Sequence, residues 1–173
     1  MADRSDPMRI HHDLAANIHA SATEVWALAG NFGNMSWHPT VTSCTIVDGA
    51  AQTPGAIREI HLQDGSRILE RLVELDRQGR SFTYSFVGTP PIPVSASHTS
   101  VTVTALPARP HARTRIAWHG EFEVAGHAAQ ATVEHVNCQI VWPSTVDALA
   151  STLGVEYSFD VPSQGNTKGN VTS

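Results

Sequence analysis

The sequence predicts one α+β domain in which a curved antiparallel sheet of seven strands wraps around a long C-terminal helix. Three observations support this prediction: a strand pattern opens the chain, six more strand-like segments follow a short helical stretch, and long helical periodicity is confined to the end. A sheet that curls around one helix can leave an internal cavity between the two. The length of 173 residues suits one such domain.

The first expected elements are a strand and two short helices. Residues 8–18 mix polar and apolar side chains as a strand does. Ser21 and Glu24 form a capping-box pattern, in which each side chain can bond to the backbone amide of the other residue. This predicts a helix over residues 22–30. A second short helix is also expected after the first strand, and residues 31–39 break the helical pattern with Gly33 and Pro39.

Six further strands are expected in a meander, each separated from the next by a turn or a break. Asp64-Gly65 is a strong signal for a two-residue hairpin turn. A proline-rich stretch at residues 89–93 separates the fourth of these strands from the fifth. The expected strands are residues 41–47, 56–62, 66–75, 81–87, 94–105 and 114–124.

The C-terminal helix is predicted from residue 125 onward, where apolar residues recur every three or four positions. Pro143 removes one backbone hydrogen bond and should kink or restart this helix. After Val155 the chain is polar and rich in Gly, Asn and Ser. We therefore expect a single domain over residues 8–155, preceded by a flexible N-terminus at residues 1–7 and followed by a disordered tail at residues 156–173.

Composition and charge exclude several classes of protein. Hydrophobic residues make up 41% of the chain and charged residues 16%, which excludes an intrinsically disordered protein. The net charge is −5 and no basic stripe is visible, which argues against a nucleic-acid partner. No apolar run approaches the length of about 18 residues that a membrane-spanning helix needs, and the N-terminus lacks the apolar region of a secretory signal.

Cofactor and metal motifs are also missing. The sequence has ten histidines but no HExxH or CxxC spacing, and adjacent His11 and His12 have poor geometry for two ligands of one metal. Neither GxGxxG, GxxxxGK[ST] nor GxSxG occurs. Cys44 and Cys138 lie far apart, which favours free thiols. We therefore expect a cytoplasmic protein, monomeric or homodimeric, that uses no metal or other cofactor.

Arg58 is the first candidate for a chemical role. It shares one face of its predicted strand with Ile60 and Leu62, and the apolar neighbours indicate that this face looks inward. A buried guanidinium group needs an anionic partner or ligand. The alternative is that Arg58 takes part in a purely structural ion pair or extends to the rim of the sheet.

Glu70 on the following strand is the candidate partner. It shares a face with Leu72, and if that face is inside, Glu70 can pair with Arg58 across the two strands. Alternation alone does not decide this, because the opposite face is also apolar, with Leu69, Val73 and Leu75.

Other residues are candidates for lining the cavity and contacting a substrate. Phe82, Tyr84 and Phe86 alternate along one strand face, a pattern that more often marks a plain core. Trp37 and His38 lie in the irregular segment, where they could contact a ligand or close one end of the core. The remaining candidates are Ile60, Leu72, Ser97, Trp118, Asn137 and Val141, with His98 of lower rank.

A series of residues in fixed order resembles a known family. It comprises Val25-Trp26, 31–35, Trp37-His38-Pro39, Cys44, Gly49, 54–58, 70–72, Leu75-Asp76, Tyr84, Pro93-Val94 and Trp118. This series resembles the START/Bet v 1-like superfamily, in its polyketide cyclase/dehydrase branch, over residues 8–155. The resemblance implies a helix-grip fold with a hydrophobic cavity between sheet and helix.

Within that superfamily the pattern is most similar to that of lachrymatory factor synthases. They share the W-P-type loop, the G-x-x-R strand and the E-x-L strand that follows it. The resemblance places the cavity arginine of that group at Arg58 and its cavity glutamate at Glu70. Its third polar residue, a tyrosine, falls on Ser97, so the phenol is absent from this chain.

Two functions from different classes fit these observations. The first is an enzyme without metal or organic cofactor, in which Arg58 stabilises developing negative charge and Glu70 is the general base or acid. It would cyclise, dehydrate or isomerise a small hydrophobic molecule that is polyketide-like or contains a carbonyl group. The second is a non-catalytic carrier or sensor of a hydrophobic ligand. A charged pair in a cleft favours the enzyme.

Overall fold

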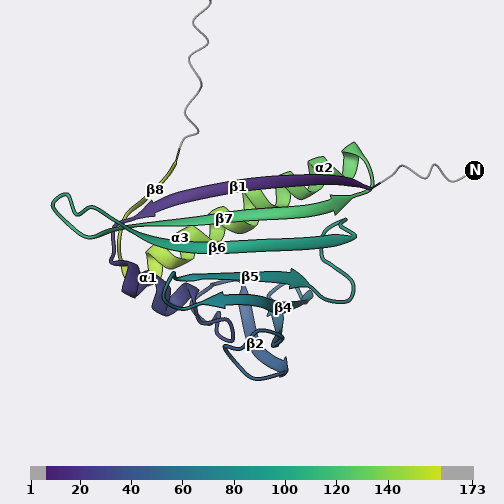
Figure 1. Ribbon diagram of the computed structural model, residues 1–173, viewed down its shortest axis with the longest axis horizontal. Helices are drawn as coiled ribbons and strands as arrows, with labels where there is room; N and C mark the ends of the chain where they lie inside the picture. The colour runs from purple at the N-terminus through teal and green to yellow at the C-terminus, as the bar shows by residue number, and fades with distance from the viewer. Residues whose placement is uncertain (1–6, 161–173) are drawn as a thin grey trace, which may run out of the picture.

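One antiparallel sheet and one long helix dominate the computed structural model, which describes residues 7–160 (Figure 1). The sheet has eight strands in these residues, and a short helix α1 (Ala22–Ala29) follows the first of them. The strands are β1 (Met8–Ile18), β2 (Val41–Asp48), β3 (Ile57–Leu62), β4 (Arg67–Asp76), β5 (Ser81–Phe86), β6 (Ala96–Leu106), β7 (Arg113–Val124) and β8 (Tyr157–Phe159).

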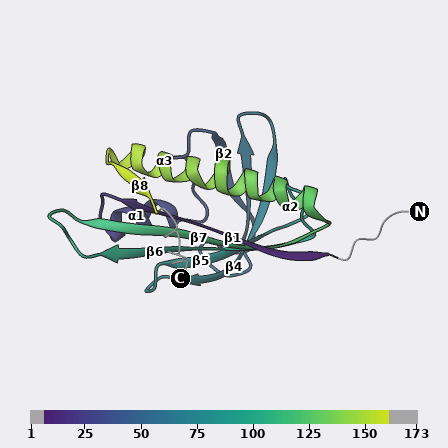
Figure 2. The same ribbon diagram turned by 90° about the horizontal axis from the view of Figure 1, so that it is seen from above.

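The strands lie in the order β2-β3-β4-β5-β6-β7-β1-β8, so consecutive strands from β2 to β7 pair as a meander. Figures 1 and 2 show the long helix lying along one face of the sheet, with β2 and its neighbours bending away from the direction of β1, β6 and β7. The predicted α+β architecture of a curved sheet around a C-terminal helix is therefore confirmed.

The sheet contains one more strand than the seven predicted. The additional strand, β8, falls within the segment predicted to be a polar tail. It pairs with the outer edge of β1, and the Asp160 side chain accepts a hydrogen bond from Asn17 and pairs with Arg115. The open backbone groups of an edge strand favour such an addition. The rest of the predicted tail, residues 161–173, and residues 1–6 of the predicted flexible N-terminus lie outside the described residues.

Only one of the two predicted short helices is present. The Ser21–Glu24 capping box is confirmed and starts α1 as expected. The second helix does not form, and residues 31–40 are a series of turns instead. Hydrogen bonds between residues three apart hold these turns. The Asn34 amide donates to the Asn31 carbonyl, and the His38 amide donates to the Met35 carbonyl. Local bonds of this kind replace a helical ladder where glycine and proline interrupt it.

The long helix has three parts: α2 (His127–Glu134), a π-helical segment η1 (His135–Val141) and α3 (Trp142–Leu153). The Trp142 amide donates to the Asn137 carbonyl, five residues back, as a π-helix requires. Pro143 lies in the first turn of α3. It has no amide hydrogen and its ring crowds the preceding turn, so the helix widens before it. The kink or restart predicted at Pro143 takes the form of a π-helical segment that ends just before α3, in a helix that continues without a gap.

A register shift in β4 resolves the choice of face that alternation leaves open. The pairing with β5 skips one residue between Leu72 and Glu74. As a result Glu70 and Leu72 are buried, while Leu75, on the opposite parity, also packs against the core. A bulge changes the phase of a strand in this way.

Two turn glycines allow a matched test of how tightly the β2–β3 turn is packed. Gly49 has a φ of +73°, and a Cβ there would lie 3.0 Å from the Cα of Ala56, which leads into the strand that carries Arg58. Gly65 in the β3–β4 turn has a φ of +85°, but a Cβ there would meet nothing within 4 Å.

We expect Gly65→Ala to lower the free energy of unfolding by about 1 kcal/mol, the cost of a left-handed conformation. Gly49→Ala should cost about 1–3 kcal/mol more, because the backbone of Ala56 must also shift. Urea unfolding of both variants measures the difference. Equal losses would contradict the close approach at Gly49.

Candidate functional site

A cavity of about 520 Å³ lies between the concave face of the sheet, the turns of residues 31–40 and the helix around the η1–α3 junction. Its walls are mostly apolar, with aromatic side chains from β5 and β7. Ile140 and Val141 of η1 line it while remaining about half exposed, at 50% and 43%. A cavity of this size suits a small organic molecule.

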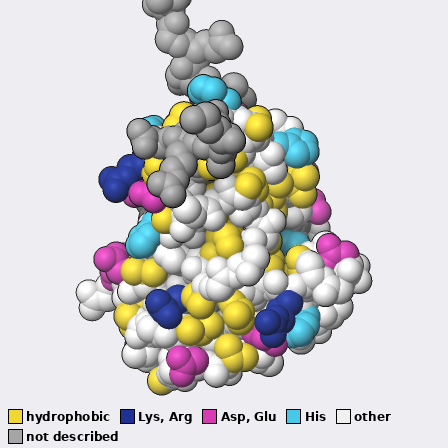
Figure 3. All heavy atoms as spheres, turned by 90° about the vertical axis from the view of Figure 1, so that its right-hand side faces the viewer, with side chains coloured by type: hydrophobic (Ala, Val, Ile, Leu, Met, Phe, Trp, Pro, Cys, Tyr) yellow, Lys and Arg dark blue, Asp and Glu magenta, His cyan; other side chains and the backbone are white. Residues whose placement is uncertain are grey.

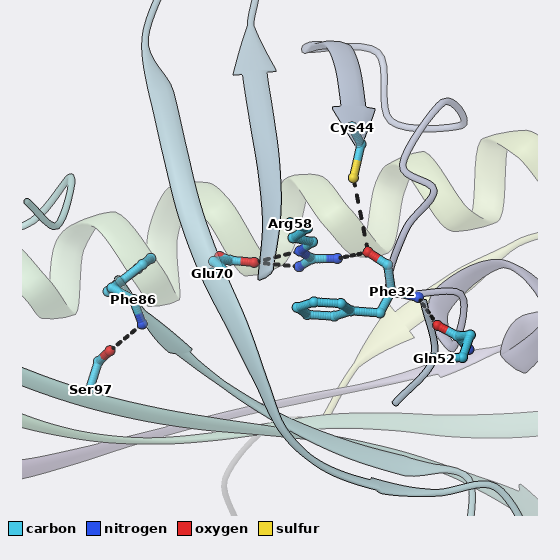
Figure 4. A network of polar contacts seen from close by, with 7 residues as sticks. All are labelled: Phe32, Cys44, Gln52, Arg58, Glu70, Phe86 and Ser97. Atoms are coloured by element: carbon cyan, nitrogen blue, oxygen red, sulfur yellow. Dashed lines mark hydrogen bonds and ion pairs between the residues drawn. The ribbon is translucent and has the colours of Figure 1, made fainter. Parts of the chain in front are cut away.

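Arg58 and Glu70 form an ion pair in the wall of this cavity. They lie directly opposite each other on β3 and β4. Nε and Nη2 of Arg58 both contact Oε2 of Glu70, at 2.7 and 2.5 Å, and Figure 4 shows both contacts reaching the same oxygen. The residues are only 7% and 6% exposed. The predicted pairing of the two residues is therefore confirmed.

The third guanidinium nitrogen ties the pair to the chain after α1. Nη1 of Arg58 donates to the carbonyl of Phe32 at 3.0 Å (Figure 4). The guanidinium carbon also lies 4.2 Å from the ring centre of Phe32 and 5.7 Å from that of Tyr84. Cation–π contacts of this kind favour the charged guanidinium. Every nitrogen of Arg58 thus has a protein partner.

Glu70 keeps one oxygen without such a partner. Among residues 7–160 no donor is placed on Oε1, although Oε2 accepts both contacts from Arg58. Oε1 is not among the side-chain atoms sealed away from solvent without a partner, and Glu70 lines the cavity. The carboxylate therefore has one oxygen committed to Arg58 and one available to a ligand.

Gln52 positions the loop that holds Arg58, and sequence reasoning missed it. Its side-chain oxygen accepts from the amide of Phe32, and its side-chain nitrogen donates to the carbonyl of Gly30, both at 2.8 Å. The residue is held at a φ of +58°, and Arg77 donates to its carbonyl. Nothing local in the sequence marks Gln52, because its partners are about 20 residues away.

Two further polar groups of the wall are neutral near pH 7. Burial, and then the charge of Glu70, raise the pKa of Tyr84 well above its ordinary value. Burial lowers the pKa of His38, and its Nδ1 lies 3.0 Å from the hydroxyl of Thr40. Both side chains line the cavity and can form hydrogen bonds without adding charge to it.

Most of the predicted site residues meet at this cavity. Arg58 and Glu70 share its wall with Trp37, His38, Ile60, Phe82, Tyr84, Trp118 and Val141. They come from the turns of residues 31–40, from β3, β4, β5 and β7, and from η1. Sequence reasoning did not find several lining residues near the mouth or in the turns, among them Asn31, Asn34, Met35, Thr40, Gln63, Asp64, Ile140, Ser144 and Thr145.

Four predicted lining residues, Leu72, Phe86, Ser97 and Asn137, are not part of the cavity wall, and neither is the lower-ranked His98. Leu72 is fully buried in the core. The hydroxyl of Ser97 accepts a hydrogen bond from the amide of Phe86 at 2.9 Å, so both groups are used within the sheet (Figure 4). Asn137 is the buried residue of η1, and its Nδ2 has no hydrogen-bond partner among residues 7–160. The lower-ranked His98 is exposed, beside Ser85.

The cysteines, the possible metal ligands, the helices and the surface charges bear on the predicted cofactors and partners. Cys44 and Cys138 are free thiols. Among residues 7–160, no group of three or more His, Cys, Asp or Glu side chains could hold a metal ion, and no helix is long and apolar enough to cross a membrane. On the face shown in Figure 3, basic side chains lie apart from one another rather than in a stripe.

The antiparallel sheet, the long C-terminal helix and the cavity between them define a helix-grip-like fold. A family model described as polyketide cyclase/dehydrase and lipid transport matches residues 9–154. The chain belongs to this family, which confirms the resemblance at family level. The closer similarity to lachrymatory factor synthases stays a prediction. No curated protein matches the sequence.

Solved structures from three bacteria are similar along most of the chain. An uncharacterized protein from Bacillus thuringiensis has 24% identity and a TM-score of 0.69, covering 83% of this chain and 98% of its own. A Thermobifida fusca protein has 28% identity and a TM-score of 0.69, covering 84% and 93%. XoxI from Bacillus cereus has 23% identity and a TM-score of 0.68, covering 82% and 94%. The two Bacillus structures support the fold alone.

The ion pair makes a testable contribution to stability. Arg58→Met leaves Glu70 as an uncompensated charge, so we expect a loss of about 3–5 kcal/mol in the free energy of unfolding. Arg58→Met combined with Glu70→Leu removes both charges and should recover most of that loss. A double-mutant cycle by urea unfolding gives the coupling energy. Additive losses would contradict a tightly coupled pair.

His38 should give the stability a pH dependence. Because burial lowers its pKa from 6.5, the unfolded chain binds a proton at a pH where the folded protein does not. The stability from neutral His38 is therefore complete above pH 6.5 and declines as the pH falls toward the lower folded-state pKa. We expect His38→Gln to flatten the decline in the free energy of unfolding between pH about 7 and about 5.

Other histidines contribute equally to both proteins in this comparison. Burial also lowers the pKa of His12, and bonding to Asp13 raises that of His119, with the opposite effect on the slope. Parallel pH profiles for the wild type and His38→Gln would contradict the role given to His38.

Proposed function

We propose that the protein is a cofactor-independent enzyme that cyclises, dehydrates or isomerises a small hydrophobic molecule containing a carbonyl group. Its cavity would hold the substrate, Glu70 would transfer a proton and Arg58 would stabilise the resulting negative charge. The observation that carries the proposal is the arrangement of the buried pair, in which Oε2 of Glu70 contacts Arg58 while Oε1 has no protein donor among residues 7–160. The family, described as polyketide cyclase/dehydrase and lipid transport, supports this class of reaction.

The proposed first step moves a proton from a substrate carbon next to the carbonyl to Oε1 of Glu70. The electron pair of the broken C–H bond shifts to the carbonyl oxygen, so an enolate forms as the carboxylate becomes neutral. The total charge of the site does not change. Arg58, which the carboxylate neutralises before the step, is then free to stabilise the new oxyanion, and an interaction that strengthens along the reaction lowers its barrier.

The fate of the proton would decide the product. Its return to a different substrate atom gives an isomer. Its transfer to a hydroxyl group on the carbon next to the enolate carbon lets that C–O bond break, so water leaves while the enolate electron pair forms a C=C bond and the carbonyl is restored. If the enolate carbon instead attacks a second carbonyl, a carbon–carbon bond closes a ring and the proton neutralises the alkoxide. The apolar walls would limit the access of water to the enolate. No step requires a metal or an organic cofactor, and we propose action in the cytoplasm as a monomer or homodimer.

The alternative is a carrier or sensor that binds a hydrophobic ligand without changing it. The largely apolar cavity walls favour this reading, and the family description includes lipid transport. The carrier predicts tight retention of an unaltered molecule. Native mass spectrometry of gently purified protein, with solvent extraction, would identify a retained compound as the starting point for assays. A product that differs in connectivity from the added compound would exclude a pure carrier.

Glu70→Gln tests the catalytic role directly. It keeps the shape of the side chain but removes the proton acceptor, so we expect kcat to fall about 10²–10⁴-fold while substrate binding changes much less. Glu74→Gln is the matched control, because it makes the same change at an exposed position of the same strand. Turnover by Glu70→Gln at the rate of this control would contradict the assignment.

A further inference from the structure

The charges around the cavity restrict what it can bind. The lining residues include one cation, Arg58, and two carboxylates, Glu70 and Asp64. Asp64 is exposed in the β3–β4 turn, where its Oδ1 accepts from the amide and the hydroxyl of Ser66. These bonds lower the pKa of Asp64, which keeps it charged. The wall therefore has no cation that lacks a carboxylate partner.

Arg58 is poorly placed to bind an anionic ligand in the resting protein. Nε and Nη2 contact Glu70, and Nη1 donates to the Phe32 carbonyl. A ligand carboxylate beside Arg58 would also lie near the negative charge of Glu70. Burying it in a largely apolar cavity would leave its charge uncompensated, which is costly.

Unlike Arg58, the carboxylate of Glu70 has an atom without a protein partner, and this atom is a hydrogen-bond acceptor. Oε1 of Glu70 faces no donor from residues 7–160, and a hydroxyl, enol or N–H group of a ligand would supply one. A hydrogen bond to a charged oxygen is stronger than one between neutral groups. Tyr84 and His38 add only neutral groups, and the aromatic walls contact an apolar body equally well whatever its charge.

We propose that the cavity selects uncharged ligands that carry a hydrogen-bond donor, and that it discriminates against carboxylates because Glu70 already neutralises Arg58. This inference rests on the proposed function in taking the cavity as the ligand site, but it does not depend on turnover. It also narrows the proposed substrates to molecules that enter the site neutral and acquire negative charge only after proton transfer.

Four two-ring probes of similar shape test the selection: 2-naphthol, 2-naphthoate, 2-methylnaphthalene and 2-naphthylmethylammonium. Calorimetric titration of the full chain at neutral pH gives their dissociation constants. We expect 2-naphthol to bind at least about tenfold more tightly than 2-methylnaphthalene, which lacks the donor, and than 2-naphthoate. Equal or tighter binding of 2-naphthoate or of the ammonium probe would overturn the proposal, as would failure of all four probes to bind.

Variants test whether the charges of Arg58 and Glu70 cause the expected order of probe affinities. In Glu70→Gln the charge of Arg58 is no longer neutralised, so 2-naphthoate should become the tightest ligand. The double variant Arg58→Met, Glu70→Leu should bind 2-methylnaphthalene and 2-naphthol with equal affinity, because both charges are gone. Glu74→Gln should keep the wild-type order. If Glu70→Gln does not fold, as circular dichroism would report, the wild-type series and the double variant still decide the question.

The outcomes separate this inference from the proposed enzyme. A Glu70→Gln variant that inverts the binding order but turns over a substrate at the wild-type rate would overturn the enzyme mechanism and support the selection. Wild-type protein with Glu70-dependent turnover that nevertheless binds 2-naphthoate best would overturn the selection alone.

Discussion

The contact between Arg58 and Glu70 is the interaction on which the site depends. It joins β3 to β4, and through the carbonyl of Phe32 it also joins the sheet to the turns after α1. Gln52 holds the same turns from the other side. Two charges removed from water are tolerable only when their hydrogen bonds are satisfied. The local backbone is therefore arranged around the guanidinium group, and one carboxylate oxygen remains for the cavity.

The same arrangement links the resting state to the proposed chemistry. Because the ion pair is neutral overall and the wall is apolar, a charged ligand would lose its hydration there without gaining a counter-ion, whereas a neutral ligand would not. When a proton reaches Glu70, the charge that was neutralised inside the protein becomes available to the substrate. Arg58 would thus interact strongly with the substrate only as the C–H bond breaks and the oxyanion forms. An interaction that is stronger in the transition state than in the ground state is what lowers the barrier.

The helix completes the cavity by departing from regular geometry. Pro143 follows the π-helical η1, and the residues at this junction, Val141 and Trp142, both line the cavity. The curved sheet supplies the opposite wall, and the register shift in β4 allows Glu70, Leu72 and Leu75 to face the interior together. Irregular backbone in both layers thus shapes the space between them.

The sequence by itself determined the order and type of nearly all elements, because apolar periodicity, turn dipeptides and the Ser21–Glu24 cap act locally. It also made Arg58 and Glu70 candidate partners on neighbouring strands, but alternation left the inward face of β4 open, and the structure decided it. Only the tertiary structure decided the features that depend on distant partners. These are the addition of β8 to the edge of β1, the hydrogen bonds of Gln52 to the turns after α1, the bond between Ser97 and Phe86, and the burial of Asn137 away from the cavity wall. These features arise from contacts between segments far apart in the chain, which no local pattern records.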